Sequence, residues 1–462
     1  MLRPLKIRAT ALSSTGRTSL LLLPSKIQIQ AQKRNKIIRH SVAPLLIGTF
    51  ILRVNGGAAP IILGRLLAQL SLQQGHPISN IHVGLIAITY FIVELTLAPV
   101  MGALSDRTGR RFFLTLGPLI GLVQVVLLVF TPTQNPLPYL LFLQVLAGVA
   151  TAMQVPAVLG YLADYTSESP TLRLRVMSLY ELATSGGFAI GVVLGGFAWD
   201  RFGRQAYALL AVGYLVVAVC MFMVPKVNQV IERSKLKVTV SRYWKVLRTP
   251  RLFIFIPAWI SISALAGIWL SSQLTFILSS YRHNPNQSLM GIFSTHGSGG
   301  HLSLVLGAFV MFFGLSLLFW AFFLNRVPRL LMMLSSITGI YLFCIALACI
   351  NHFGTGNPVL MVIWILLLLV SIFAESSFAP AALAYLADIS EDAAKDRGLL
   401  MGLYSVFLGL GQLLGGALGA VFAQIWGFDG LIYLTALLAF VALVALLMLL
   451  RTERLVGVHG IK

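Results

Sequence analysis

Long runs of apolar residues recur along almost the whole chain, and their length is the strongest constraint on its fold. The hydrocarbon core of a bilayer is about 30 Å thick, and a helix needs roughly 20 consecutive apolar residues to cross it. Runs of this kind occupy residues 44–68, 81–104, 111–130, 138–163, 173–199, 205–225, 252–280, 302–325, 328–350, 358–387, 398–424 and 429–450. Only 10% of the 462 residues are charged, against roughly 25% in soluble domains. The sequence therefore predicts an all-α membrane protein with twelve transmembrane helices.

The distribution of lysine and arginine predicts how these helices are oriented. Twelve spans place both termini on one side, and 29 of the 34 basic residues fall on that side. Because loops rich in Lys and Arg stay in the cytoplasm, we expect cytoplasmic termini and a location in the plasma (cell inner) membrane. The net charge of +20 lies in loops and tails, so we expect a lipid bilayer and no nucleic acid as partner. Residues 1–41 are predicted to be a basic, disordered cytoplasmic tail, although a targeting segment has a similar composition.

A repeat at an offset of 224 residues indicates an internal duplication. The segment from Pro156 to Asp164 recurs from Pro380 to Asp388 in the same register. Each copy contains an even number of spans, so both insert in the same orientation, as in transporters whose substrate path lies between two halves. We expect two six-helix bundles, at 42–225 and 252–451, joined by a basic cytoplasmic loop at 226–251 and followed by a tail at 452–462.

The loop between the second and third spans contains a distinctive charged motif, Gly102-Ala-Leu-Ser-Asp106-Arg107-Thr-Gly109-Arg110-Arg111. Its glycines permit a tight turn, and its arginines can pair with carboxylates at other helix ends, of which Asp164 and Glu168 are the nearest candidates. The motif resembles the Gly-x-Leu-x-Asp-Arg-x-Gly-Arg-Arg loop of the major facilitator superfamily. The resemblance implies the fold of that superfamily and a cytoplasmic gating loop that latches the two halves. Its residues are Gly102, Asp106, Arg107, Gly109, Arg110, Arg111 and Asp164.

Glycines at four-residue spacing mark the fifth span and its repeat, where they favour close helix packing. They are Gly187, Gly191, Gly195 and Gly196 in the first copy and Gly411, Gly415 and Gly419 in the second. The first group is similar to the Gly-x-x-x-Gly-Pro-x-x-Gly-Gly stretch of the drug:proton antiporter branch. Val192 stands at the position of the proline.

A few polar residues inside the spans are candidates for binding substrate or coupling protons, because burying them in a membrane is costly. They are Arg53, Asn55, Glu94, Gln144, Gln154, Glu181, Gln273 and Glu375. Around Asn55, two glycines and Pro60 predict an interrupted helix of the kind that lines a binding site. A static pair of Arg53 with Glu181 or Glu94 and snorkelling to the lipid edge are alternatives, and the glutamines can instead join helices by hydrogen bonds.

The sequence thus predicts a monomeric secondary transporter that works by alternating access. We expect proton-coupled export of small hydrophobic or amphipathic compounds. Uptake of a small, possibly anionic metabolite and a non-transporting sensor or assembly factor are the alternatives. No nucleotide-binding stretch, zinc signature or nucleophile motif occurs, so we expect no enzyme activity, cofactor or metal.

Overall fold

The computed structural model is helical throughout the spans that it describes. The described residues are 42–73, 78–166, 170–225, 250–280, 284, 286–323, 327–353, 357–391 and 397–459. The predicted tail at 1–41, Glu168 and nearly all of the predicted loop at 226–251 lie outside these residues.

Six long helices make up the first half of the chain, which we call the N-half. They are α2 (Ala43–Gln73), α3 (Asn80–Thr108), α4 (Arg110–Val129), α5 (Pro136–Tyr165), α6 (Pro170–Phe202) and α7 (Ala206–Phe222). Gly109 separates α3 from α4 with φ of 104°, and Gly203 opens the short 3-10 helix η1 (Gly203–Gln205) with φ of 54°. Both values lie where glycine is favoured, so these glycines allow the chain to reverse between adjacent helices.

The described part of the second half, which we call the C-half, contains eight helices. They are α9 (Pro250–Trp269), α10 (Ser272–Ser279), α11 (Gly299–Phe323), α12 (Arg329–Phe353), α13 (Pro358–Glu375), α14 (Phe378–Glu391), α15 (Arg397–Trp426) and α16 (Phe428–His459). Two predicted spans are broken here, one between α9 and α10 and the other between α13 and α14. The last helix continues through most of the segment predicted as a tail.

Eleven helical stretches of the described chain are long and apolar enough to cross a membrane. One of them, Arg175–Phe222, has 48 residues and contains both α6 and α7, with η1 between them. A single helix of that length would extend about 72 Å, more than twice the bilayer core of about 30 Å. It therefore represents two spans, and the prediction of twelve transmembrane helices is confirmed.

The interruption predicted in the first span is wrong, because α2 runs without a break from Ala43 to Gln73. Gly57 lies so close to α6 that a Cβ atom there would collide with the backbone carbonyl of Phe188. This tight packing compensates for the low helix propensity of glycine. Transmembrane helices also tolerate a proline such as Pro60 when neighbouring helices support them.

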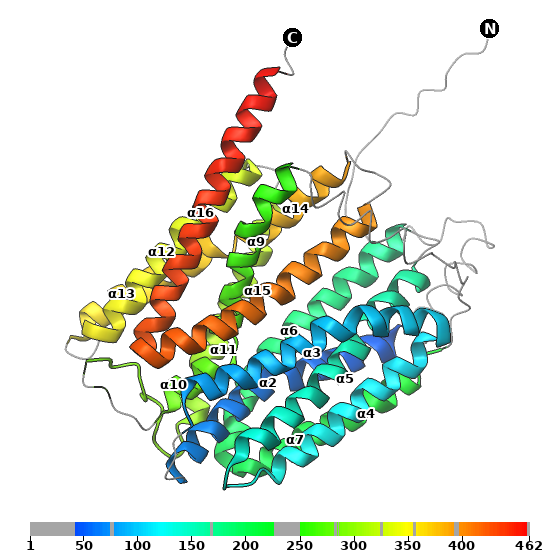
Figure 1. Ribbon diagram of the computed structural model, residues 1–462, viewed down its shortest axis with the longest axis vertical. Helices are drawn as coiled ribbons and strands as arrows, with labels where there is room; N and C mark the ends of the chain where they lie inside the picture. Colours follow the sequence, from blue (N-terminus) through cyan, green and yellow to red (C-terminus); the bar gives the residue numbers. More distant parts are fainter. Residues whose placement is uncertain are drawn as a thin grey trace, which may run out of the picture.

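The two halves meet where α3 packs on α15, α6 packs on α11, and α10 packs on both α2 and α3. In Figure 1, α3 and α15 run side by side where the halves meet. We call the end of the bundle that carries Gly203 and Gly427 the distal end, and the end that carries Gly109 and His459 the proximal end. Because the number of spans is even, both ends of the described chain lie at the proximal end.

The apolar cores are arranged differently at these two ends. One large core joins the halves and includes Leu66 and Leu70 of α2 together with Phe276 and Ile277 of α10, near the distal end. A separate core holds the proximal part of the N-half and includes Phe113. The halves are thus packed together distally, whereas the proximal part of the N-half has a core of its own.

Candidate functional site

Three charged side chains from three helices of the N-half form a cluster inside the membrane. The charge of Arg53 on α2 acts on both Glu94 of α3 and Glu181 of α6. Among the described residues, neither carboxylate comes within the 4.0 Å of an ion pair with Arg53, and the buried Nε of Arg53 has no hydrogen-bond partner. Glu181 is exposed, and the other two side chains are half-buried. The three side chains are therefore not closed into an ion pair, and Glu181 lies at the surface of the protein.

A tyrosine connects this cluster to the fourth span. The Tyr90 side chain lies one helical turn before Glu94 on α3 and interacts electrostatically with its carboxylate. The Tyr90 hydroxyl donates to Thr151 Oγ1 of α5 at 3.2 Å. Tyr90 thereby connects α3 to α5 close to Glu94. Its role was not predicted from the sequence, although a tyrosine four residues before an intramembrane glutamate is a visible signal.

The uncharged polar residues that were predicted as binding or coupling candidates lie at separate places in the structure. Asn55 is buried and donates from Nδ2 to the backbone oxygen of Leu210 at 3.0 Å, so it joins α2 to α7. Gln144 and Gln154 are buried in α5, and within the described chain the Gln154 Nε2 has no partner. Gln273 lies on α10 at the distal contact between the halves. Of this group, none has a described contact with the charged cluster.

Glu375 lies apart from the cluster, in the C-half. It is the last residue of α13, immediately before the break that separates α13 from α14. The hydroxyls of the next two serines donate to backbone oxygens, Ser376 to Phe373 at 2.8 Å and Ser377 to Met332 at 3.0 Å. Ser376 thus satisfies a carbonyl at the break, whereas Ser377 connects the break to α12. A carboxylate at a helix break in mid-membrane remains a candidate for proton transfer, but separately from Arg53.

The predicted gating loop forms a compact ionic group at the proximal end. Arg110 pairs with Asp106 at 2.7 Å and, through Nε, with Asp164 at 2.6 Å. The guanidinium lies over Gly160 of α5, where a Cβ atom would collide with it. Asp164 is one of the two carboxylates that the sequence suggested as partners. These ion pairs all lie within the N-half.

The other residues of this loop differ in their contacts and exposure. Gly102 packs against α5, where a Cβ would lie 3.3 Å from that of Pro156. Arg107 is exposed. Arg111 donates to the backbone oxygen of Phe222, and its guanidinium lies 4.6 Å from the centre of that ring. Arg111 therefore connects α4 to the end of α7.

The spaced glycines lie at close helix contacts in both halves. On α6, Gly187 and Gly191 face the backbone of α2 at Phe50 and Val54, and Gly195 faces Ala58. Gly196 faces α11 across the boundary between the halves. Their counterparts Gly411 and Gly415 face α9, while Gly419 leaves more space around it. The duplicated pattern thus corresponds to two equivalent helix pairs, α6 with α2 and α15 with α9.

Sequence reasoning missed a polar network that closes the distal end. Arg65 of α2 is 6% exposed and donates to the backbone oxygen of Phe293 and to Ser279 Oγ in the C-half. Asp200 of α6 lies 3.8 Å from Arg65 and accepts from the backbone amides of Gly299 and Gly300, at 2.9 and 2.7 Å. We call Arg65, Asp200 and these α11 amides the distal network. An arginine within the apolar run of the first span was the available signal.

A second distal connection involves the start of α3. Asn80 donates from Nδ2 to the backbone oxygen of Ala423 at 3.1 Å, and its Oδ1 accepts from Gln273 Nε2 at 2.6 Å. Its backbone amide donates to Gln424 Oε1 at 3.1 Å. One residue of the N-half is thus bonded to two helices of the C-half.

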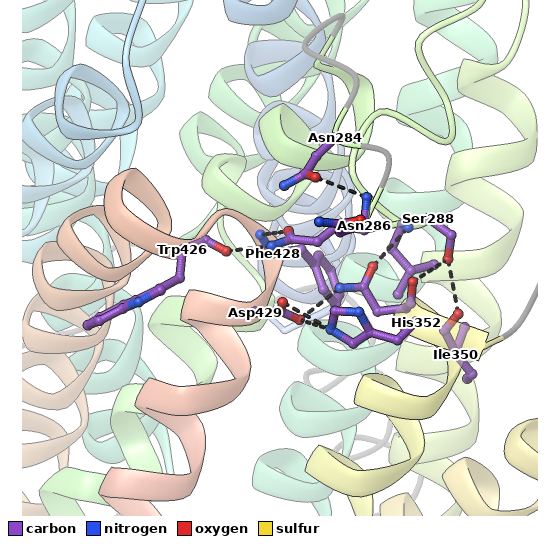
Figure 2. Close-up of polar contacts among 11 residues, drawn as sticks. Asn284, Asn286, Ser288, Ile350, His352, Trp426, Phe428 and Asp429 are labelled. Carbon is purple, nitrogen blue, oxygen red and sulfur yellow. Dashed lines mark hydrogen bonds and ion pairs between the residues drawn. The ribbon is translucent and has the colours of Figure 1, made fainter.

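The distal end of the C-half is itself held by a buried polar group (Figure 2). Asp429 accepts from Asn351 Nδ2 at 2.8 Å and lies 3.0 Å from His352 Nε2. Gln287 donates to the backbone oxygen of Trp426 and accepts from the amide of Phe428, so it holds the turn between α15 and α16. In the part of the chain that the structure describes, no three His, Cys, Asp or Glu side chains gather into a metal-binding group.

Sequence relatives of this chain include bacterial drug-resistance proteins. Multidrug resistance protein 2 of Bacillus subtilis is 26% identical over 353 residues, which cover 74% of this chain and 80% of that protein. Quinolone resistance protein NorA of Staphylococcus aureus is 22% identical over 345 residues, covering 73% of this chain and 80% of NorA. Multidrug efflux pump LfrA of Mycolicibacterium smegmatis is 30% identical, but only over 127 residues, 28% of this chain and 24% of LfrA.

Solved transporter structures share the fold at low sequence identity. Nucleoside transporter NupG matches with a TM-score of 0.66 and 14% identity, covering 88% of this chain and 98% of NupG. An inward-facing, occupied structure of a bacterial homolog of the human lysosomal transporter Spinster matches with a TM-score of 0.65 and 12% identity, covering 89% of this chain and 96% of that one. The sequence profile described as Major Facilitator Superfamily matches residues 45–295 and 284–459. The chain, a multi-pass secondary transporter distantly related to drug efflux proteins, therefore belongs to the major facilitator superfamily.

Proposed function

We propose that the chain is a proton-coupled exporter of small hydrophobic or amphipathic compounds. The observation that carries this proposal is the open cluster of Arg53, Glu94 and Glu181, three charges from three helices that are not closed into an ion pair. Carboxylates inside a membrane that keep access to water can take up and release protons. The relationship to proteins named for multidrug and quinolone resistance supports export as the direction.

Charge balance suggests how this cluster would couple protons to substrate. With both carboxylates ionised, Arg53 leaves one negative charge uncompensated. A cationic amphipathic substrate would neutralise that charge on binding. Protonation of Glu94 or Glu181 from the other side of the membrane would neutralise it instead, and the substrate would lose its partner and leave.

Alternating access would use the two ends of the bundle in turn. The distal network and Asn80 hold the halves together at the distal end in the present conformation. The ion pairs of Arg110 lie within the N-half at the proximal end, where that half has its own core. Opening the distal end would break the first set of contacts, and the loop from Gly102 to Arg111 would then latch the halves proximally.

We place both termini, and hence the proximal end, in the cytoplasm, and the protein in the plasma membrane. The asymmetry of lysine and arginine supports this orientation. A fluorescent protein fused after Lys462 is expected to fluoresce, and alkaline phosphatase fused at the same position is expected to be inactive. The opposite pair of results would contradict the orientation.

Uptake of a small anionic metabolite is the second candidate. The observation that favours it is the unpartnered Nε of Arg53, a buried donor that an anionic substrate could satisfy. A non-transporting sensor or assembly factor is the third, and it would require no flux at all. The direction of flux distinguishes uptake from export, and the absence of flux would indicate a sensor or assembly factor.

The experiment is accumulation of a cationic dye in efflux-deficient bacteria that express the chain, with and without a protonophore. We expect cells that express the chain to accumulate less dye. The protonophore, Glu94→Gln and Glu181→Gln are each expected to abolish this decrease. Arg201→Gln is the control, since Arg201 is exposed at the distal end. Unchanged accumulation, with the protein detected in the membrane, would contradict export. Unimpaired flux after neutralising Arg53, Glu181 and Glu375 together would exclude their coupling role.

A further inference from the structure

A cavity of about 620 Å³ opens at the proximal end of the N-half, away from the charged cluster. It lies between the start of α4, the end of α7 and Tyr161 of α5. Thr108, Arg110 and Arg111 line its polar side, and Leu116, Leu119 and Phe222 line its apolar side. The cavity thus places cationic groups directly beside a surface suited to hydrocarbon.

A buried hydroxyl in the cavity wall lacks a hydrogen-bond partner. Tyr161 is 3% exposed, and within the described chain its hydroxyl neither donates to nor accepts from any other group. A buried hydroxyl left unpaired costs free energy. The hydroxyl is closed off from solvent, so an oxygen acceptor on a ligand in the cavity would supply the missing bond once a neighbouring side chain moves aside.

Among the residues that the structure describes, no carboxylate forms an ion pair with Arg111. Arg110 is already paired with Asp106 and Asp164, whereas Arg111, among the residues described, contacts only the backbone oxygen and ring of Phe222. A guanidinium carries five N–H donors, so most of those of Arg111 remain available. The adjacent first turn of α4 has no side-chain cap, because Gly109 precedes it. Its amide groups add to the preference for an anion.

The apolar wall of the cavity belongs to the lipid-facing surface. Phe112 is 60% exposed and Phe222 is 62% exposed at the edge of the cavity. In a protein with twelve spans, apolar side chains this exposed near the ends of helices contact the acyl chains of the bilayer. A free inorganic anion would leave this wall uncovered.

We propose that the cavity is a binding site for an anionic phospholipid of the leaflet at the proximal end. The phosphate group would bind Arg111 and the first turn of α4. An ester oxygen would accept from the Tyr161 hydroxyl, and an acyl chain would lie along Leu116, Leu119 and Phe222. This proposal does not depend on the substrate or on the direction of transport.

The test uses the purified full chain in detergent and native mass spectrometry with added lipid. Phosphatidylglycerol is expected to bind and to raise the thermal unfolding midpoint, and phosphatidylcholine is expected to do so much less. Arg111→Gln is expected to weaken phosphatidylglycerol binding at least about tenfold. Tyr161→Phe removes only the hydroxyl and is expected to weaken it severalfold. Arg201→Gln, at the opposite end of the N-half, is the matched control and is expected to bind normally.

Three results would overturn the proposal. The first is equal binding of phosphatidylglycerol and phosphatidylcholine to the unmodified chain. The second is phosphatidylglycerol binding that is unchanged in both single variants, Tyr161→Phe and Arg111→Gln. The third is an equal rise in the unfolding midpoint with inorganic phosphate, which would indicate a simple anion site. If Arg111→Gln does not fold, Tyr161→Phe alone decides between these outcomes.

Discussion

Single polar residues in this protein divide into those that we propose for proton coupling and those that hold helices together. Arg53 and Asn55 are two residues apart on α2, yet Arg53 acts on two carboxylates and Asn55 bonds to a backbone oxygen of α7. Residues two apart on a helix point in directions about 200° apart. The first therefore faces the charged cluster while the second faces the packed interior of the N-half.

Removing the charge of Arg53 is expected to uncouple transport. In Arg53→Gln, Glu94 and Glu181 lose the cation between them, so proton-driven flux in proteoliposomes should fall at least about tenfold. Arg53→Lys keeps the charge and should retain more activity. Substrate exchange without a gradient serves as the control, since it needs no coupling. Full proton-driven flux in Arg53→Gln would contradict the role of the cluster.

Asn55 is expected to affect stability and not the range of substrates. Asn55→Ala removes the 3.0 Å hydrogen bond to Leu210 and should lower the free energy of unfolding by about 1–2 kcal/mol. The thermal unfolding midpoint in detergent measures this loss. A changed substrate range with an unchanged midpoint would instead place Asn55 in the binding site.

At the scale of helices, the duplicated halves use the same contact in different ways. Arg110 lies over Gly160 and reaches Asp164, whereas Arg329 donates to the backbone oxygen of Ala384, which stands at the repeat position of Gly160. A Cβ atom at Gly160 would collide with the Arg110 guanidinium, so that contact requires glycine at this position. The two arginines therefore make different contacts, and the position that they approach is glycine in the N-half and alanine in the C-half.

Adjacent glycines on α2 offer a matched test of helix packing. Gly57 faces the backbone of α6, and Gly56 has no atom within 4 Å of an added Cβ. Gly57→Ala is expected to destabilise the protein by about 1–3 kcal/mol through overpacking. Gly56→Ala should be neutral or stabilising by up to about 1 kcal/mol, because alanine is the better helix former. Equal unfolding midpoints for the two variants would contradict the close contact of α2 with α6.

The whole molecule is held in its present conformation by contacts at the distal end. The distal network brings Arg65 and Asp200 of the N-half to the beginning of α11 in the C-half. A hydrogen bond to a charged group contributes about 1.5–3 kcal/mol. Losing one should therefore shift the balance between the two conformations at least about tenfold toward the distally open form.

Arg65→Gln and Asp200→Asn test this shift through distances between spin labels. Leu72 and Ile292 are exposed distal sites in the N-half and the C-half, and they can be labelled after the native cysteines are replaced. Pulsed electron paramagnetic resonance is expected to show a larger population of long distances in both variants than in Arg201→Gln. Identical distance distributions in all three would indicate that the distal network does not hold the halves together.

Local sequence was sufficient for the spans, the loop motif and the residues that the membrane makes costly. A bilayer imposes its thickness on each segment separately, so twelve spans can be read from the chain without knowing how they pack. The same reasoning failed for the break expected in α2, because contact with α6 outweighs the propensity of two glycines and a proline.

Only the tertiary structure decided which polar groups meet. Arg65 and Ser279 are 214 residues apart in the chain, and Asn80 and Ala423 are 343 apart, yet each pair shares a hydrogen bond. The unpartnered hydroxyl of Tyr161 is likewise a property of its surroundings. The length of an apolar run determines that a helix crosses the membrane, but it leaves open the rotation and neighbours of that helix. These depend on side-chain packing between helices, which no single segment encodes.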